Sequence, residues 1–232
     1  TFGSGSPNNP IGEPRPFYIL QNGVTVRLKG GYPPGTTGKA DNDFSGKIYT
    51  AVSQSELEQL DKLTTDWSLI CTTLCTSLEK LFFDISLNPK ISHFDTVNVV
   101  SLYRTFAFND IFNANIDYWD VSNVVTMFEM ARECIENNQP YASWDVRTTQ
   151  NMDGMFKDNI SFNQDLSSWC VQQFPSEPDE FSVNTPLWVL PKPSWGVFCG
   201  GTTRPNKMTI LSIVEQQSTT PPSQMTILTI TN

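Results

Sequence analysis

The chain has 232 residues, of which 38% are hydrophobic and 17% are charged, so much of it is uncharged and polar, as in turn-rich secreted or surface proteins. Its formal charge of −9 argues against a nucleic-acid partner, because binding to phosphates requires clustered Lys and Arg. No segment approaches the ~18 apolar residues that cross a bilayer, and the opening TFGSGSPNNP lacks the basic and apolar regions of a signal peptide. We therefore expect no membrane-spanning segment and a numbering that starts after a cleavage site or inside a longer chain.

Residues 1–21 are interpreted as an N-terminal extension and residues 22–66 as a cap. NGVTVRL from Asn22 alternates polar and apolar residues after an Asn-Gly turn, and GKIYTAV from Gly46 alternates again, so the two segments together predict a β-hairpin. In SQSELEQLDKL, Ser53 is followed by a Glu with the spacing of a capping box and then by leucines at helical spacing. A hairpin and helix of this kind would close the open end of a repeat array.

Residues 67–169 contain a repeat of about 25 residues. One slot holds an aromatic residue four times, and the slot eight residues later holds Leu or Met. These predicted core residues are Phe94, Trp119, Trp144 and Trp169, with Leu102, Met127 and Met152. A spacing that persists over so many residues is typical of stacked units, each of which covers its apolar face only by packing on its neighbours. We therefore expect these rings and thioethers to fill a shared interior and not to form a cofactor pocket.

The pattern within one unit predicts a strand followed by a short helix. Trp119 and Val121 alternate as residues on one strand face do, whereas Val124, Met127 and Met130 have the threefold spacing of a helical turn. The whole unit approximates the leucine-rich pattern LxxLxLxxNxLxxL. We therefore predict an α/β repeat fold, in which about four 25-residue coils form a leucine-rich-repeat-like solenoid after the N-terminal hairpin and helix cap.

Two polar columns keep the same spacing as the core. Asn precedes the aromatic slot by six residues and Asp follows it directly, at Asn88, Asn113, Asn138 and Asn163 and at Asp95, Asp120 and Asp145. Short amide and carboxylate side chains can satisfy the backbone groups of turns. We favour this role over the alternative, a ladder of calcium ligands, and expect no metal site.

Five cysteines occur in the chain, at Cys71, Cys75, Cys134, Cys170 and Cys199. The first two do not have the spacing of a zinc knuckle, and because His93 is the one histidine in the sequence, a tetrahedral metal site would need nearly every thiol. Disulfides are therefore favoured if the chain is exported, and the odd number leaves at least one thiol unpaired.

No constellation of catalytic residues emerges from the sequence. GTTGKA lacks the first Gly and the final Ser or Thr of a phosphate-binding loop. His93 could in principle assist Cys71 as a nucleophile, but an ordinary surface histidine is the favoured interpretation. Glu177 with Asp179 and Glu180 is interpreted as a solvated turn rather than as a glycosidase pair. We expect no enzymatic activity and no cofactor.

Two near-copies, PNKMTILSI and PSQMTILTI, lie within residues 201–232. Each is an apolar, β-branched strand preceded by Pro. We rank three roles in this order: opening strands of a further domain, strands that return to the edge of the repeats, or an arm that adds to a sheet of another subunit. The candidate assembly strands contain Met208, Ile210 and Ile213, and Met225, Ile227 and Ile230.

WDVSNVVTM, MDGMF and SFNQDLSSW resemble the repeats of the BspA-like family, also called DUF285, which is widespread in exported bacterial proteins. The resemblance covers Ile70 to Trp169 directly, and the flanking segments are similar to that family's amino-terminal and closing caps. The units from Tyr103 to Phe112 and around Cys134 depart from the family pattern, so we expect irregular turns there.

The resemblance also implies a closing cap over residues 170–200, with a disulfide between Cys170 and Cys199 that would contribute about 3 kcal/mol. Cys71 with Cys75 is the second choice. The expected architecture is thus a solenoid with a disulfide-closed C-terminal cap and a β-strand tail.

BspA-like proteins are associated with adhesion, and the resemblance supplies no catalytic residue. We therefore expect a secreted or cell-surface protein whose repeats bind a protein or glycan on another cell or in a matrix. The alternative is a structural subunit of an extracellular assembly, which binds copies of itself through its terminal segments. Exposed aromatic residues on one face, such as Tyr118 and Tyr141, would favour adhesion. Asn159, in NIS, would be a candidate glycan acceptor in a eukaryotic secretory route.

Overall fold

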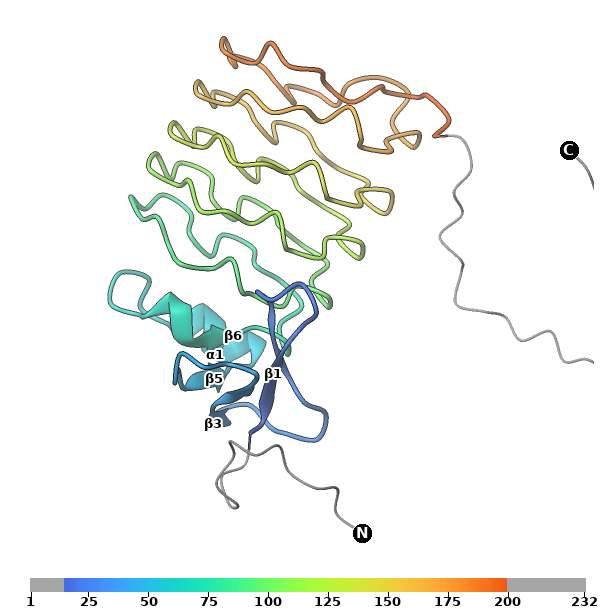
Figure 1. The fold of residues 1–232 in the computed structure, drawn as a ribbon. Helices are drawn as coiled ribbons and strands as arrows, with labels where there is room; N and C mark the ends of the chain where they lie inside the picture. Colours follow the sequence, from blue (N-terminus) through green and yellow to red (C-terminus); the bar gives the residue numbers. More distant parts are fainter. Residues whose placement is uncertain (1–14, 200–232) are drawn as a thin grey trace, which may run out of the picture. The chain divides into compact units, whose positions relative to one another are not determined.

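The computed structural model describes residues 15–199, in which two small sheets and a helix are followed by a stack of turn-rich layers (Figure 1). The strands are β1 (Phe17–Ile19), β2 (Val26–Leu28), β3 (Thr37–Gly38), β4 (Ala40–Asp41), β5 (Tyr49–Ala51) and β6 (Ile70–Cys71). One sheet has the order β2-β1-β4, with β1 antiparallel to β2 and parallel to β4. The other has the order β3-β5-β6, with β5 antiparallel to β3 and parallel to β6.

The predicted hairpin between residues 22–28 and 46–52 is wrong. The Asn-Gly turn instead joins β2 to β1, which precedes it. The side-chain oxygen of Asn22 accepts hydrogen bonds from the backbone N–H groups of Val24 and Thr25, both at 3.0 Å. A tight turn pairs the segments directly on either side of it, so the later segment is left to pair within the second sheet.

The capping box at Ser53 is confirmed. Helix α1 (Gln54–Gln59) begins after Ser53, whose hydroxyl accepts from the N–H of Glu56 at 3.3 Å, while the Glu56 carboxylate accepts from the N–H of Ser53 at 2.7 Å. The helix is shorter than the leucine spacing indicates, because Leu60 already has an extended backbone.

The predicted α/β solenoid is wrong. Within residues 15–199, the regular strands form the two small sheets, and the helical elements are α1 and the 3₁₀ helix η1 (Trp67–Leu69), both of which precede residue 70. Where a strand and a helix were expected, the layers contain short turns. The N–H of Val124 donates to the carbonyl of Val121 at 2.9 Å, and that of Met130 to Met127 at 3.1 Å. Such turns reproduce the threefold spacing of a helix without forming one.

Left-handed residues explain why these turns do not continue as helices. Backbone φ is +52° at Lys80, +50° at Arg104, +46° at Glu129 and +62° at Gly154. A residue in this region interrupts a right-handed helix, and its backbone groups must find partners elsewhere. The partners lie in the next layer. The N–H groups of Arg104, Phe106 and Phe108 donate to the carbonyls of Phe128, Met130 and Arg132 at 2.8–2.9 Å.

The same pairing extends through the units that depart from the family pattern. Isolated parallel bridges join Ser77 to Ser101, Ser101 to Thr126, and Thr126 to Asn151. The Cys134 N–H donates to the carbonyl of Ala131 at 3.4 Å, as in the other turns. The irregular turns expected from Tyr103 to Phe112 and around Cys134 are therefore not observed.

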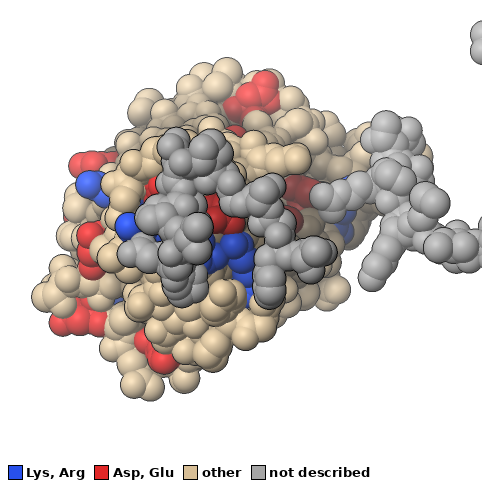
Figure 2. All heavy atoms as spheres, turned by 60° about the horizontal axis from the view of Figure 1, so that its bottom comes forward, with Lys and Arg blue, Asp and Glu red and all other residues tan. Residues whose placement is uncertain are grey.

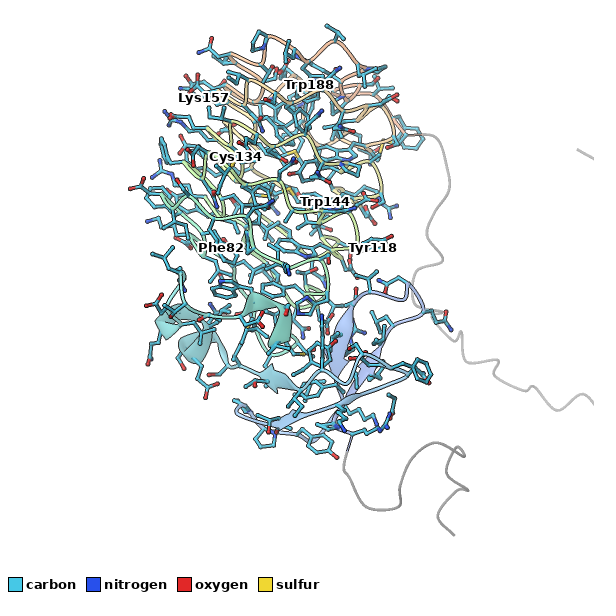
Figure 3. The ribbon with its side chains drawn as sticks, turned by 60° about the vertical axis from the view of Figure 1, so that its left-hand side comes forward. Phe82, Tyr118, Cys134, Trp144, Lys157 and Trp188 are labelled. Carbon is cyan, nitrogen blue, oxygen red and sulfur yellow. A yellow bond between two sulfur atoms is a disulfide. The ribbon has the colours of Figure 1, made fainter. Side chains whose placement is uncertain are left out.

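The aromatic column lies in the interior, as Trp144 does in Figure 3. All seven predicted core residues are at most 4% exposed: Phe94, Trp119, Trp144, Trp169, Leu102, Met127 and Met152. The indole N–H groups of Trp119, Trp144 and Trp169 donate to carbonyls of the preceding layer at 3.1, 3.2 and 2.8 Å. Each Trp therefore adds both apolar area and a buried hydrogen bond to the contact between layers.

The asparagine column satisfies the backbone of turns, as predicted. The side-chain oxygen of Asn88 accepts from the N–H of Asn113 at 3.0 Å, that of Asn113 from Asn138 at 3.2 Å, and that of Asn138 from Asn163 at 2.8 Å. Each amide thus serves the layer that follows it. A column with this role needs no bound cation.

The disulfide between Cys170 and Cys199 is present, with a Cα–Cα distance of 5.7 Å. The second choice, Cys71 with Cys75, is wrong, because both are free and buried, as is Cys134. The Cys71 thiol lies 3.4 Å from the carbonyl of Val26, whereas the Cys75 thiol lies 3.5 Å from the carbonyl of Val52. The Cys71 thiol therefore packs against β2, and the Cys75 thiol packs against the residue that follows β5.

Two other predicted features are placed differently by the structure. Asn159 is fully buried, and its amide, in the orientation that satisfies its neighbours, donates to the carbonyl of Cys134 at 2.8 Å. It is therefore not accessible for glycosylation in the folded chain.

Tyr141, which was expected on an exposed face, is fully buried as well, with its hydroxyl 3.0 Å from the side-chain oxygen of Asn137. The candidate assembly strands of residues 201–232 lie outside the described residues.

Candidate recognition surface

One face of the stack carries aromatic and basic side chains that contact one another across three layers. We call this set the strip; it consists of Lys80, Phe83, Tyr103, Arg104, Phe108, Phe128 and Arg132. All seven are partly or fully exposed. Their turns, at residues 78–84, 102–108 and 127–133, are joined by backbone hydrogen bonds, so the spacing between equivalent side chains is fixed by the backbone.

Two stacked rings form the middle of the strip. The ring centroids of Tyr103 and Phe128 lie 5.3 Å apart, with planes 9° from parallel. The guanidinium of Arg104 lies 5.3 Å from the first ring centroid and 5.6 Å from the second. Lys80 approaches the Tyr103 ring from the preceding layer at 5.6 Å. Each cation–ring contact contributes about 0.5–1 kcal/mol at an exposed site.

A buried carboxylate holds the two arginines in place. Glu129 is 6% exposed and accepts hydrogen bonds from Arg104 Nε at 2.6 Å and from Arg132 Nη1 at 2.7 Å. Burial lowers the pKa of Arg132, but the hydrogen bond and negative charge of Glu129 raise it above its ordinary value. Arg132 also lies 5.1 Å from the ring of Phe108. The guanidinium groups of Arg104 and Arg132 are therefore held in place against the rings of the strip.

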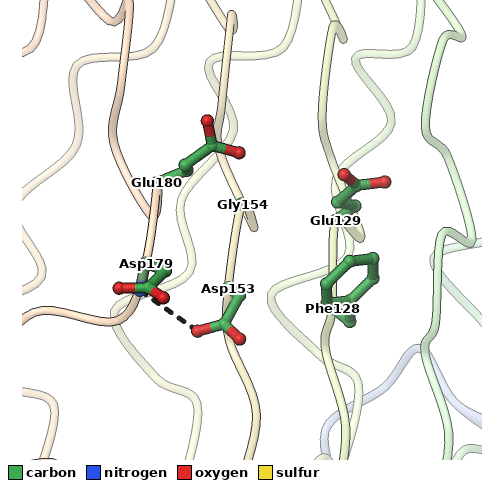
Figure 4. A pocket seen from close by; sticks show the side chains of 6 residues that line it. All are labelled: Phe128, Glu129, Asp153, Gly154, Asp179 and Glu180. Atoms are coloured by element: carbon green, nitrogen blue, oxygen red, sulfur yellow. Dashed lines mark hydrogen bonds between the residues drawn. The ribbon is translucent and has the colours of Figure 1, made fainter.

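The strip ends at a hollow in the next layer. Gly154 occupies the slot that holds Arg104 and Glu129 in the two preceding layers. Because those residues adopt the same left-handed φ, the backbone alone does not require glycine here. A Cβ at this position would lie 3.0 Å from Cγ of Glu129, so glycine leaves room for that side chain. The hollow of about 410 Å³ is lined by Phe128, Glu129, Asp153, Gly154, Asp179 and Glu180 (Figure 4).

Four carboxylates line this hollow, and they differ in their partners. Glu129 is paired with two arginines, and Glu180 accepts a hydrogen bond from Lys157 at 2.6 Å. Asp153 accepts from the backbone N–H of Asp179 at 3.1 Å, the contact drawn in Figure 4. The hollow therefore has a negative wall beside the ring of Phe128. Within residues 15–199, no group of three or more His, Cys, Asp or Glu side chains is arranged to hold a metal ion.

The nucleophile considered from the sequence does not fit the structure. His93 is partly buried: its Nε2 lies 2.9 Å from the carbonyl of Ile70, and desolvation lowers its pKa to about 4. Burial also raises the pKa of Cys71, so its thiolate is disfavoured. Both groups contact backbone carbonyls, of Ile70 and Val26, and neither lines the hollow at Gly154. A histidine-activated cysteine is therefore not supported.

The surface residues named from the sequence do not coincide with the strip. Lys157 lies one unit of 25 residues after Arg132 and so marks the side of the stack that carries the strip. Tyr118 is 46% exposed, and it lies on the opposite side of the stack from Lys157 in Figure 3. Glu177 lies near the hollow in sequence but hydrogen-bonds with Ser182. The sequence does contain a signal for the strip, because an aromatic residue recurs nine residues after the aromatic slot, as Tyr103 and Phe128. Arg104 follows Tyr103 directly.

Charged side chains form separate groups on the face shown in Figure 2, and uncharged residues cover most of its described surface. Electrostatic attraction to a partner on this face is therefore local. No helix within residues 15–199 has the length and apolar character needed to span a membrane.

Residues 76–186 match the family model described as "Mycoplasma protein of unknown function, DUF285". The match covers somewhat less than half of the chain and includes the layers that carry the strip and the hollow. No curated protein and no solved structure matches the chain significantly.

Proposed function

We propose that the protein is a non-enzymatic, cell-surface recognition module that binds a partner protein through the strip. The similarity of residues 76–186 to DUF285 supports this proposal, since the repeats resemble those of BspA-like proteins, which are associated with adhesion. The disulfide between Cys170 and Cys199 fits an exported chain, because such bonds persist in oxidising surroundings.

The observation that carries the proposal is the composition and rigidity of the strip. Tyr, Phe and Arg are enriched in the contact regions of protein interfaces, and Tyr and Arg dominate their binding energy. Tyr103 and Arg104 are already held by neighbouring rings and by Glu129, so binding would immobilise few additional side chains. Preorganisation of this kind lowers the entropic cost of association.

Binding of the fluorescently labelled protein to bacterial cells, animal cells and immobilised matrix proteins tests the proposal. Tyr103→Ala removes a central ring of the strip, whereas Tyr118→Ala removes an exposed ring from the opposite side and serves as the matched control. We expect the first variant to weaken binding at least about tenfold and the second to leave it unchanged. Equal effects of the two variants, or no binding of the unmodified protein to any of these surfaces, would contradict the proposal.

A second candidate function is subunit contact in an extracellular assembly. Apolar side chains are exposed in the last described layer, where Leu187 is 59% exposed, Val189 80% and Phe198 76%. An exposed apolar end favours contact with another chain. Light scattering of the full chain and of a chain that ends at Gly201 tests this alternative. A multimer that persists on truncation supports assembly through these exposed apolar side chains, and one that is lost assigns the contact to the residues after Gly201. A monomer in both cases contradicts the alternative.

A further inference from the structure

The hollow at Gly154 continues the strip by one layer but lacks the side chain that fills the equivalent slot before it. In the preceding layers this slot holds Arg104 and then Glu129. Figure 4 shows the ring of Phe128 and the carboxylate of Asp153 side by side on neighbouring layers, with Gly154 next to them. The Glu129 side chain occupies the space directly over Gly154, and the hollow of about 410 Å³ beside it can admit a side chain from outside.

Within residues 15–199, basic side chains balance only part of the negative charge around this space. Glu129 and Glu180 have basic partners, at 2.6–2.7 Å. Among the described residues, no Lys or Arg lies within ion-pair distance of Asp153 or Asp179. Two carboxylates thus remain without a cationic partner beside an aromatic ring.

The neighbouring layer shows which group fits such surroundings. Arg104 lies 5.6 Å from the ring of Phe128 and 2.6 Å from the carboxylate of Glu129, so an aromatic face and a carboxylate of the following layer hold one guanidinium. At the hollow, Phe128 again supplies the ring, and Asp153 and Asp179 supply carboxylates. The hollow therefore offers the same two kinds of group, a ring and carboxylates, with the ring supplied here by the preceding layer.

We propose that the hollow binds the guanidinium of an arginine side chain presented by the partner protein. This inference rests on the proposed recognition function and specifies the chemistry of its partner. Arginine is preferred to lysine because its planar, weakly hydrated cation stacks on a ring while it donates hydrogen bonds to carboxylates. The arginine completes the pattern that Arg104 forms within the chain.

The test is an NMR titration of the labelled full chain with N-acetyl-arginine N-methylamide. The citrulline analogue, which is neutral and of nearly the same shape, is the matched probe. We expect saturable shifts centred on the amides of Gly154 and Asp179, with a dissociation constant on the order of 1–10 mM, as befits one small side chain. The citrulline analogue should bind at least about fivefold more weakly than the arginine probe.

Variants identify the carboxylates. Asp153→Asn retains an oxygen that can accept from the Asp179 N–H, so it removes charge without removing that hydrogen bond. Asp153→Asn and Asp179→Asn should each weaken arginine binding several-fold, whereas Asp84→Asn, an exposed position on an earlier layer, should not. Equal binding of the two probes, no shift at the hollow, or equal effects of all three variants would overturn the inference.

The outcome is separable from that of the proposed function. If the arginine probe fails to bind but Tyr103→Ala still weakens cell binding, recognition through the strip stands and the arginine site at the hollow does not. If the probe binds at the hollow but Tyr103→Ala leaves cell binding intact, the arginine site stands and recognition through the strip fails.

Discussion

The ion pair between Arg27 and Asp95 joins the N-terminal cap to the first repeat layer, and its removal should destabilise the whole chain. The Asp95 side chain is 1% exposed and accepts from Arg27 Nε at 2.8 Å, from Arg27 Nη2 at 2.7 Å, and from Thr73 Oγ1 at 2.7 Å. The Arg27 side chain is 26% exposed, so water can rehydrate it more readily than the carboxylate.

Breaking a buried pair by removing one partner costs about 3–5 kcal/mol, because the remaining charge is left without compensation. We expect Asp95→Asn to cost about 3 kcal/mol, at the low end, since the remaining cation is partly solvated. Arg27→Met leaves a buried carboxylate supported by Thr73 alone and should cost about 4 kcal/mol. The double variant should cost about 1–3 kcal/mol less than the sum, because each single change already breaks the pair.

Equilibrium unfolding in guanidinium chloride, followed by tryptophan fluorescence, gives these free energies from the midpoint and slope. Arg147→Met, which removes the exposed pair with Asp145, is the control and should cost less than about 1 kcal/mol. Additive effects of the two cap substitutions would show that the pair does not couple the cap to the repeats.

Three further predictions concern other contacts. Burial lowers the pKa of His93 to about 4 from its ordinary 6.5, so between these pH values the unfolded chain binds more protons than the folded chain. The free energy of unfolding should therefore fall as the pH drops from 6.5 towards 4. His93→Gln should flatten this pH dependence in unfolding curves measured across that range. Trp144→Phe removes the indole N–H that donates to the buried carbonyl of Ile116, which still accepts from the N–H of Trp119 at 3.0 Å, so the lost hydrogen bond should cost about 1 kcal/mol in chemical unfolding. A cost below ~0.5 kcal/mol would contradict the role given to the indole N–H. The double variant Cys170→Ser, Cys199→Ser should have a free energy of unfolding about 3 kcal/mol lower than that of the unmodified chain. A reductant should lower the free energy of unfolding of the unmodified chain by the same amount. If the reductant has no effect, the disulfide is not formed in solution.

Burial was predictable from the sequence, but local backbone geometry was not. The period placed Trp119 and Met127 in the core, because residues that repeat at one spacing must cover the same face. The helix expected from Val124 to Met130 failed, because separate turns closed by i to i+3 hydrogen bonds give the same apolar spacing as a helix. Left-handed φ at Glu129, a residue usually found in right-handed helices, has no signal in composition.

The candidate site was missed for a related reason. Tyr103 lies in a unit that departs from the family pattern, and the departure was interpreted as loss of regular structure. The backbone pairing is retained there, and the side chains of Tyr103 and Arg104 are partly exposed. Gly154, in contrast, matches the family pattern closely, so its effect on the surface could be recognised only from the position of Glu129. Departures from a consensus at exposed slots are therefore where specificity should be sought.

The asparagine column has a consequence for how such a chain can change in length. The side-chain oxygens of Asn88, Asn113 and Asn138 each accept from the backbone N–H one full unit of 25 residues later. Duplication or loss of a whole unit therefore preserves these hydrogen bonds, whereas a shift of one residue breaks them. Growth by whole units would extend the exposed face in fixed increments, and new side chains could be sampled there without any redesign of the interior.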